Sequence, residues 1–165
     1  MTRMLGMKKS SKTYKKWLWP IEKLLILVVI IVVVFTFQFS AHFAVGGAMY
    51  PYIQDSTWVL YDRHGKVVRN TVISYKQGGT MRIGRVVAIP GDSVDVDHGK
   101  CFVNGVEQES FYRVLGSVAK HTVESRHYFV LNDYRSNMND SRKFGDIDEK
   151  NIEGTYFTSV HTGSI

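Results

Sequence analysis

The segment Asp140-Ser141-Arg142 places a hydroxyl group between two opposite charges. A serine becomes a nucleophile when a neighbouring group takes its proton. A serine flanked by a carboxylate and a guanidinium more often serves as a hydrogen-bonding strut, because its neighbours are occupied with each other. We therefore interpret Ser141 as a structural residue, with catalysis as the less favoured alternative.

Metal-binding chemistry finds no support in the sequence. The six histidines lack the paired spacing of zinc ligands (His42, His64, His98, His121, His127 and His161). Asp92, Asp95 and Asp97 lack the glycine and the terminal glutamate of a calcium loop. The single cysteine, Cys101, has no partner for an intramolecular disulfide and is predicted to be a small strand residue. We expect no metal and no cofactor.

The net charge is concentrated at the N-terminus. The chain has 165 residues and a formal charge of +6. Residues 1–23 contain seven basic side chains and one acidic one, which leaves fourteen basic and fourteen acidic residues in the remainder. A neutral domain offers no basic face for phosphates, so we do not expect a nucleic-acid partner.

A long apolar run follows this basic block. Residues 24–37 carry no charge and only one polar side chain, Thr36, and the run extends to about residue 45. A helix needs about 20 residues to cross a bilayer. The alternative is a cleavable secretory signal, but the best cleavage site falls inside the motif at residues 46–51. We predict a cytoplasmic tail at 1–23, a single-pass anchor in the cell membrane at 24–45 and an extracellular domain at 46–165.

The rest of the chain predicts β structure. Runs of β-branched and aromatic residues predict strands at 58–61, 67–74, 82–89, 94–96, 101–103, 122–123, 127–131 and 156–161. His64-Gly65, His98-Gly99 and Asn104-Gly105 lie between neighbouring runs, and such pairs are typical of hairpin turns. We expect a mainly β, antiparallel, hairpin-rich domain, with the membrane span as its one helix.

Four segments, in order, resemble the motifs of the type I signal peptidase family, the membrane-bound serine proteases that remove signal peptides. They are GGAMYP (46–51), IGRVVAIPGDSVDV (83–96), GKCFVNG (99–105) and LNDYRSNMNDSRKFG (131–145). In the family these correspond to a Ser-Met-x-Pro box, a Lys-Arg-Val and Pro-Gly-Asp box, a strand with an Asn-Gly turn, and an Asp-Ser-Arg box. The resemblance covers nearly the whole chain. It implies a signal-peptidase-like β domain after one N-terminal transmembrane helix.

The chain departs from the family at the catalytic positions. Members of the family cleave with a Ser/Lys dyad, in which a neutral lysine is the general base. The serine position is Ala48 and the lysine position is Gly84, and the serine that supports the lysine is replaced by Met138. One inactivating substitution would explain Ala48 but not the other two. The resemblance therefore implies no catalytic residue, with Asp140 and Arg142 retained as a structural ion pair.

Peptide binding in this family needs no catalytic group, because an extended substrate adds to exposed strand edges. We expect such edges at 48–53 and 81–83. The predicted peptide cleft is formed by Met49, Tyr50, Pro51, Met81, Arg82 and Ile83.

The predicted function is the binding of exported polypeptides without cleavage. The chain resembles inactive relatives that accompany surface pili in Gram-positive bacteria, which implies an accessory or chaperone role in pilin polymerisation. Candidate partners are an exported protein or pilin subunit, a sortase, and a second copy of the chain. Two alternatives remain open: an active or substrate-trapped serine peptidase with altered catalytic residues, and a structural membrane protein whose cleft is filled by Met138 and Tyr52.

Overall fold

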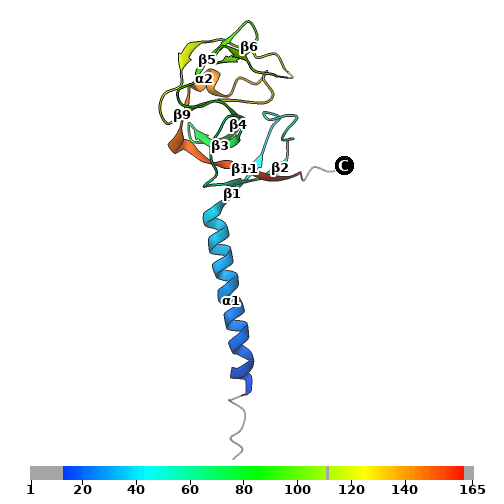
Figure 1. Ribbon diagram of the computed structural model, residues 1–165. Coiled ribbons are helices and arrows are strands. Elements are labelled where there is room, and N and C mark those ends of the chain that lie inside the picture. Colours follow the sequence, from blue (N-terminus) through cyan, green and yellow to red (C-terminus); the bar gives the residue numbers. More distant parts are fainter. Residues whose placement is uncertain (1–12, 111, 162–165) are drawn as a thin grey trace, which may run out of the picture. The chain divides into compact units, whose positions relative to one another are not determined.

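The structure is a computed structural model that describes residues 13–110 and 112–161 (Figure 1). The chain divides into two compact units, with the boundary between Phe37 and Gln38. The first unit is one long helix, α1 (Thr13–Gln38), whose last residue already belongs to the second unit. Within α1, Trp19–Gln38 is long and apolar enough to cross a membrane. Such a helix near the N-terminus is typical of a membrane anchor or a signal sequence.

The predicted anchor, residues 24–45, and helix α1 differ at both ends. The helix starts at Thr13, inside the predicted tail, whose residues 1–12 lie outside the described part of the chain. It ends at Gln38, and Phe39–Ala44 forms strand β1. Ser40 and Ala44 of this strand are buried, whereas Ala41 and Phe43 are exposed. Side chains of a strand alternate between its two faces, and β1 pairs along its full length with the next strand.

The second unit consists mainly of strands. After β1 they are β2 (Thr57–Asp62), β3 (Val72–Gln77), β4 (Thr80–Ala88), β5 (Ser93–Asp97), β6 (Lys100–Val103), β7 (Val106–Glu107), β8 (Val118–Thr122), β9 (His127–Leu131), β10 (Ile147–Asp148) and β11 (Ile152–His161). Two short helical segments were not predicted, α2 (Ser141–Phe144) and the 3-10 turn η1 (Glu149–Asn151).

The strands form two sheets in which all neighbours are antiparallel. The seven-stranded sheet has the order β1-β2-β11-β3-β4-β9-β10, and the four-stranded sheet has the order β7-β6-β5-β8. Within this unit, β5 and β6 lie at one end and β1, β2 and β11 at the other (Figure 1). The predicted mainly β, antiparallel fold is confirmed.

Two of the three predicted turns form hairpins. His98-Gly99 joins β5 to β6, and Asn104-Gly105 joins β6 to β7. Both residues of each pair have positive φ, with values of 50° and 81° in the first turn and 53° and 79° in the second. This is the backbone that two-residue hairpin loops require.

The hairpin predicted at His64-Gly65 does not form. Strand β11 lies between β2 and β3 and pairs with both of them. Gly65 is close to this inserted strand, because a Cβ atom at Gly65 would overlap the side chain of Thr155. A glycine in the turn after β2 therefore provides room for β11.

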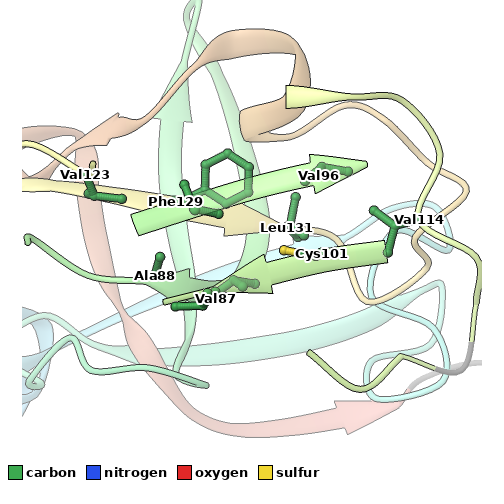
Figure 2. Packing of buried hydrophobic residues seen from close by; sticks show 10 residues of the cluster. Val87, Ala88, Val96, Cys101, Val114, Val123, Phe129 and Leu131 are labelled. Atoms are coloured by element: carbon green, nitrogen blue, oxygen red, sulfur yellow. The ribbon is translucent and has the colours of Figure 1, made fainter. Parts of the chain in front are cut away.

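One apolar cluster joins the four-stranded sheet to β4 and β9 (Figure 2). The residues that Figure 2 labels are Val87, Ala88, Val96, Cys101, Val114, Val123, Phe129 and Leu131. Cys101 is 1% exposed, and burial raises the pKa of its thiol to about 11. Its predicted role as a small strand residue is confirmed, since a thiol in this environment stays protonated near neutral pH.

Candidate functional site

A cleft of about 430 Å³ lies within the β unit. Its volume falls in the range of ligand pockets, about 300 to 1,000 Å³. The lining residues come from β1 and the segment after it, from β3 and β4, and from the segment after β9. They are His42, Phe43, Ala44, Val45, Gly46, Ala48, Met49, Ile53, Ser74, Thr80, Met81, Arg82, Ile83, Asn132, Asn137 and Asn139.

Two unpaired strand edges border this cleft. β1 is the outermost strand of its sheet, so it has a described partner on one side only. β4 pairs with β3 along residues 80–85, but its pairing with β9 begins only at Arg85. Five consecutive residues from 42 to 46 and four from 80 to 83 line the cleft. Neighbouring side chains of a strand point to opposite faces, so a consecutive run lines a cleft when the backbone edge itself faces it.

The predicted cleft residues divide into two groups. Met49 and the run Met81, Arg82 and Ile83 line the cleft, whereas Tyr50 and Pro51 do not. The predicted edge at 48–53 is wrong, because this segment is a turn. The Ile53 N–H donates to the Met49 carbonyl at 2.9 Å, so the segment uses its backbone groups locally. β1 provides the edge instead, and its residues had been assigned to the anchor.

Ala48 lies in the wall of the cleft. Its carbonyl accepts a hydrogen bond of 3.0 Å from the Tyr134 N–H, which ties the turn to the segment after β9. The side chain at this position is a methyl group, which cannot attack a carbonyl carbon. The position predicted to correspond to the nucleophile is therefore part of the cleft and carries no reactive group.

Gly84 is buried in β4 and does not line the cleft. A Cβ atom at Gly84 would lie 2.5 Å from Cγ1 of Val130 and 3.4 Å from Cε1 of Tyr75. Real Cβ atoms do not approach other atoms as closely as 2.5 Å. Both neighbours are fully buried, so the space in which a lysine side chain would begin is occupied. Sequence reasoning missed Val130, since only the pairing of β4 with β9 brings it here.

Met138 and Tyr52 do not fill the cleft. Neither residue lines it. Met138 is 39% exposed, and its Cε atom would lie 2.7 Å from a Cβ atom at Gly116. Tyr52 is about half exposed and lies against Arg85, with 4.8 Å between the guanidinium carbon and the ring centroid. The alternative of a cleft plugged by these two side chains has no support in the structure.

The segment after β9, residues 132–144, is held by the predicted ion pair; we call it the support loop. Arg142 Nη2 lies 2.6 Å from Asp140 Oδ2, and both side chains are fully buried. Arg142 also donates to three carbonyls, those of Leu115, Arg135 and Asn137, at 2.7, 2.6 and 2.6 Å. Asp140 caps α2 by accepting from the Arg142 N–H at 3.1 Å, and its other oxygen accepts from the Asn132 N–H at 3.0 Å.

Ser141 belongs to the same network. Its Oγ accepts a hydrogen bond of 2.9 Å from the Val130 N–H, and the residue is 3% exposed. This hydrogen bond thus joins α2, which begins at Ser141, to strand β9. The interpretation of Ser141 as a strut is confirmed.

Several polar atoms of cleft residues have no hydrogen-bond partner in the described part of the chain. They are Nε2 of His42, Oγ of Ser74 and Nε of Arg82, and all three are buried. A buried polar atom without a partner costs about 1 to 3 kcal/mol. These atoms suit the cleft to a ligand that carries hydrogen-bonding groups.

The described residues contain no cluster of three or more His, Cys, Asp or Glu side chains that could hold a metal ion. The ring of Tyr75 lies 3.4 Å from a Cβ atom at Gly84, and its hydroxyl is buried without a partner among the described residues. Burial raises the pKa of this phenol well above its usual range. It remains protonated at neutral pH and is no substitute for a neutral lysine as the base.

Comparisons with known proteins agree on one family. The family described as signal peptidase, peptidase S26, matches residues 16–160. The chain is 28% identical to Inactive signal peptidase IA of Staphylococcus aureus (strain Mu50) over 94 residues, which are 50% of this chain and 54% of that protein. It is 24% identical to Signal peptidase I S of Bacillus subtilis (strain 168) over 138 residues, 72% of this chain and 75% of that protein.

The chain thus spans about half the length of the S. aureus relatives that it matches. A solved structure of signal peptidase I from Enterococcus faecalis V583 has a TM-score of 0.49 and 23% identity, and covers 55% of this chain and 97% of that chain. The family match extends over most of the chain and includes Ala48 and Gly84, the predicted dyad positions. This chain belongs to the signal peptidase family, peptidase S26.

Proposed function

We propose that this chain is a catalytically silent signal-peptidase-like protein that holds an exported polypeptide in its cleft without cleaving it. The observation that carries the proposal is the cleft itself. It is open, it is bordered by two unpaired strand edges, and it contains Ala48 in the nucleophile position. Such edges bind an extended peptide through main-chain hydrogen bonds.

The directions of the strands suit one bound peptide. Each neighbouring pair in the series β1, β2, β11, β3 and β4 is antiparallel. β1 and β4 therefore run in the same direction. A peptide between them would meet both edges in the same relative orientation and could pair with both.

The absence of cleavage follows from the chemistry of the side chains. A methyl group at position 48 supplies no nucleophile, and Val130 occupies the space next to Gly84 where a lysine would begin. Ser141 is committed to the Val130 N–H. One relative that matches half of this chain is itself named an inactive signal peptidase, and our proposal gives this chain the same status.

The proposal includes a location and a role. Helix α1 anchors the chain in the membrane, with the basic N-terminus in the cytoplasm and the β unit outside. The protein acts there as an accessory or chaperone in pilin polymerisation, with a pilin subunit or a sortase as its partner. A protease added to intact cells without a wall is then expected to degrade the chain after residue 45 and to spare the N-terminal tail. Protection of the β unit would contradict this topology.

Crosslinking in living cells tests the binding function. A photo-reactive amino acid replaces Met81 or Ile83 at the open edge of β4, and a matched control replaces the exposed Lys150 on η1. The cleft positions are expected to capture an exported polypeptide that the control does not capture. A synthetic peptide from the captured region should lose binding when its backbone nitrogens are methylated at alternate residues, because these nitrogens pair with strand edges. Unchanged binding of the methylated peptide would contradict the proposal.

An activity assay distinguishes an inactive protein from a peptidase that uses another serine. The full chain in detergent is expected to leave a signal-peptide substrate intact. Turnover that disappears in Ser74→Ala or Ser141→Ala would overturn the proposal. The double variant Ala48→Ser with Gly84→Lys is also expected to be inactive, because misplacement of a reacting group by about 1 Å can cost on the order of a hundredfold in rate. Efficient cleavage by this variant would show that the remaining cleft still supports catalysis.

A further inference from the structure

A second pocket, of about 350 Å³, shares no lining residue with the cleft. Its residues come from five parts of the β unit. They are the turn at 48–53, the loop before β3, strand β4, the segment after β7 and the support loop. Its lining residues include Tyr52, Arg85, Glu109, Ser110, Asp133 and Arg135. Nothing in the proposed cleft function uses this pocket.

Arg135 is a buried cation that forms no direct ion pair with any described residue. The residue is 7% exposed, and its Nη1 atom is buried with no hydrogen-bond partner. No hydrogen bond or ion pair joins its guanidinium to any residue within 13–110 and 112–161. An isolated buried charge is costly, and proteins normally pair it.

The two carboxylates whose charges favour the cationic form of Arg135, Asp133 and Asp140, are already engaged. Both oxygens of Asp133 accept from Arg85, at 2.8 and 2.6 Å. Both oxygens of Asp140 accept from Arg142, at 2.9 and 2.6 Å. Burial lowers the pKa of Arg135, as expected for a cation that has left water without gaining a direct partner.

We propose that the second pocket binds a carboxylate group of a ligand, with Arg135 as the residue that pairs with it. A guanidinium binds carboxylate and phosphate through two parallel hydrogen bonds. The charges in the pocket favour the carboxylate. Arg85 and Asp133 neutralise each other, and Glu109 contributes a further negative charge from an exposed position. Because Glu109 repels anions, a carboxylate with one negative charge suits the pocket better than a phosphate dianion.

The carboxylate has two sources with the same chemistry: an acidic side chain of a polypeptide or a free small carboxylate. Pro51 and Tyr52 of the pocket follow the cleft residues Ala48 and Met49 in the chain after one intervening residue, Tyr50. This favours an acidic side chain of a polypeptide.

The test measures the melting temperature of the full chain in detergent at constant ionic strength. The probes are N-acetylglutamate α-amide, which has one side-chain carboxylate, and the neutral N-acetylglutamine α-amide. The glutamate probe is expected to raise the melting temperature in a dose-dependent way, because a ligand that binds the folded state stabilises it. The glutamine probe is expected to have no effect. Equal responses to the two probes would overturn the proposal.

Variants assign the effect to Arg135. Arg135→Gln is expected to weaken binding of the glutamate probe by about tenfold or more, since it removes the cation of a charge-assisted pair. The matched control Arg126→Gln removes an arginine of which 73% of the side chain is exposed and is expected to bind as the wild type does. Wild-type affinity in Arg135→Gln would overturn the proposal. If this variant does not fold, Arg135→Lys replaces it and is expected to bind more weakly than wild type.

Two further measurements identify the source of the carboxylate. An extended hexapeptide with one central glutamate is expected to bind more tightly than the single residue, and equal affinities would assign the pocket to free small carboxylates. Glu109→Gln is expected to bind the probe at least as tightly as the wild type, because it removes a competing acid. Weaker binding by Glu109→Gln would show that Glu109 does not compete with the ligand carboxylate for Arg135. Glu109 would then be part of the binding site.

Discussion

Arg142 and Arg135 lie seven residues apart in the support loop, and both are buried. Arg142 has a carboxylate and three carbonyls as acceptors. Arg135 has none among the described residues. The same residue type therefore serves two purposes, and burial alone does not distinguish them. The number of acceptors does: a saturated guanidinium fixes the fold, and an unsaturated one is available to a ligand.

The same contrast separates the Asp140-Ser141-Arg142 network from the cleft. In the support loop, Asp140, Ser141 and Arg142 all have partners. In the cleft, His42 and Ser74 each keep a buried polar atom without one. The Asp140-Ser141-Arg142 network thus has its polar groups satisfied, whereas part of the cleft wall does not.

Arg142→Ala should produce the largest loss of stability. It leaves Asp140 as a buried charge without its cation, which typically costs about 3 to 5 kcal/mol. The melting temperature of the β unit should fall by about 10 °C or more. Thermal unfolding followed by circular dichroism measures the effect, with Arg126→Ala as the exposed control. An unchanged melting curve would mean that Arg142 does not hold the support loop.

Gly84→Ala tests whether the lysine position is closed. The added methyl group meets Cγ1 of Val130, and overpacking of a buried site costs about 1 to 3 kcal/mol. Gly47→Ala is a matched control, because the nearest atom to a Cβ there is 4.0 Å away. Urea unfolding of both variants gives the comparison. A Gly84→Ala variant as stable as the control would show that Val130 moves aside at little cost in free energy of unfolding.

Asp92 provides a pH-dependent test of a third ion pair. The residue is 5% exposed and pairs with Arg69, and this pairing, together with the Ile89 N–H, lowers the pKa of Asp92 to about 2 from an ordinary value of 3.8. A lowered folded-state pKa contributes stability above pH 4 and loses it as the pH falls from 4 towards 2. The contribution is about 2 kcal/mol.

The wild type should therefore lose more stability than Asp92→Asn when urea unfolding is compared at pH 7 and pH 3. Asn cannot titrate, so the difference between the two proteins isolates the carboxylate. Parallel losses in both proteins would show that other groups control acid unfolding.

Arg135→Gln should have the smallest effect on stability and so completes the comparison. It removes a buried charge that has no partner, so the free energy of unfolding without ligand should change by less than about 1 kcal/mol or should increase. Urea unfolding measures it beside Arg142→Ala. A loss as large as that of Arg142→Ala would show that Arg135 is a scaffold residue too.

Much of the fold could be predicted from local sequence signals. Asn104-Gly105 and His98-Gly99 specify turns of two residues, and hairpins depend on such local geometry. The position of β11 could not be predicted, because its pairing with β2 joins Thr155 to Asp62 across most of the domain sequence. β1 was missed because its apolar residues continue the apolar run of α1, and only Ser40 and His42 indicate the alternation.

The candidate site was predicted where it depends on one strand and missed where it depends on several. Met81, Arg82 and Ile83 lie in a single strand that the sequence identifies. The closure at Gly84 depends on the register between β4 and β9. Arg135 has no carboxylate partner because Asp133 accepts from Arg85 and Asp140 accepts from Arg142. No sequence pattern indicates which arginine pairs with which aspartate.

The contact between Gly84 and Val130 also bears on how the chain could regain catalysis in evolution. A side chain at position 84 must either displace a buried valine or wait for its replacement by a smaller residue. Neither single change yields a peptidase, and the first would be destabilising by about 1 to 3 kcal/mol. A return to a Ser/Lys dyad therefore requires a change at Val130 as well as at positions 48 and 84. The contact at Gly84 is therefore an obstacle to catalysis that is independent of the missing hydroxyl at position 48.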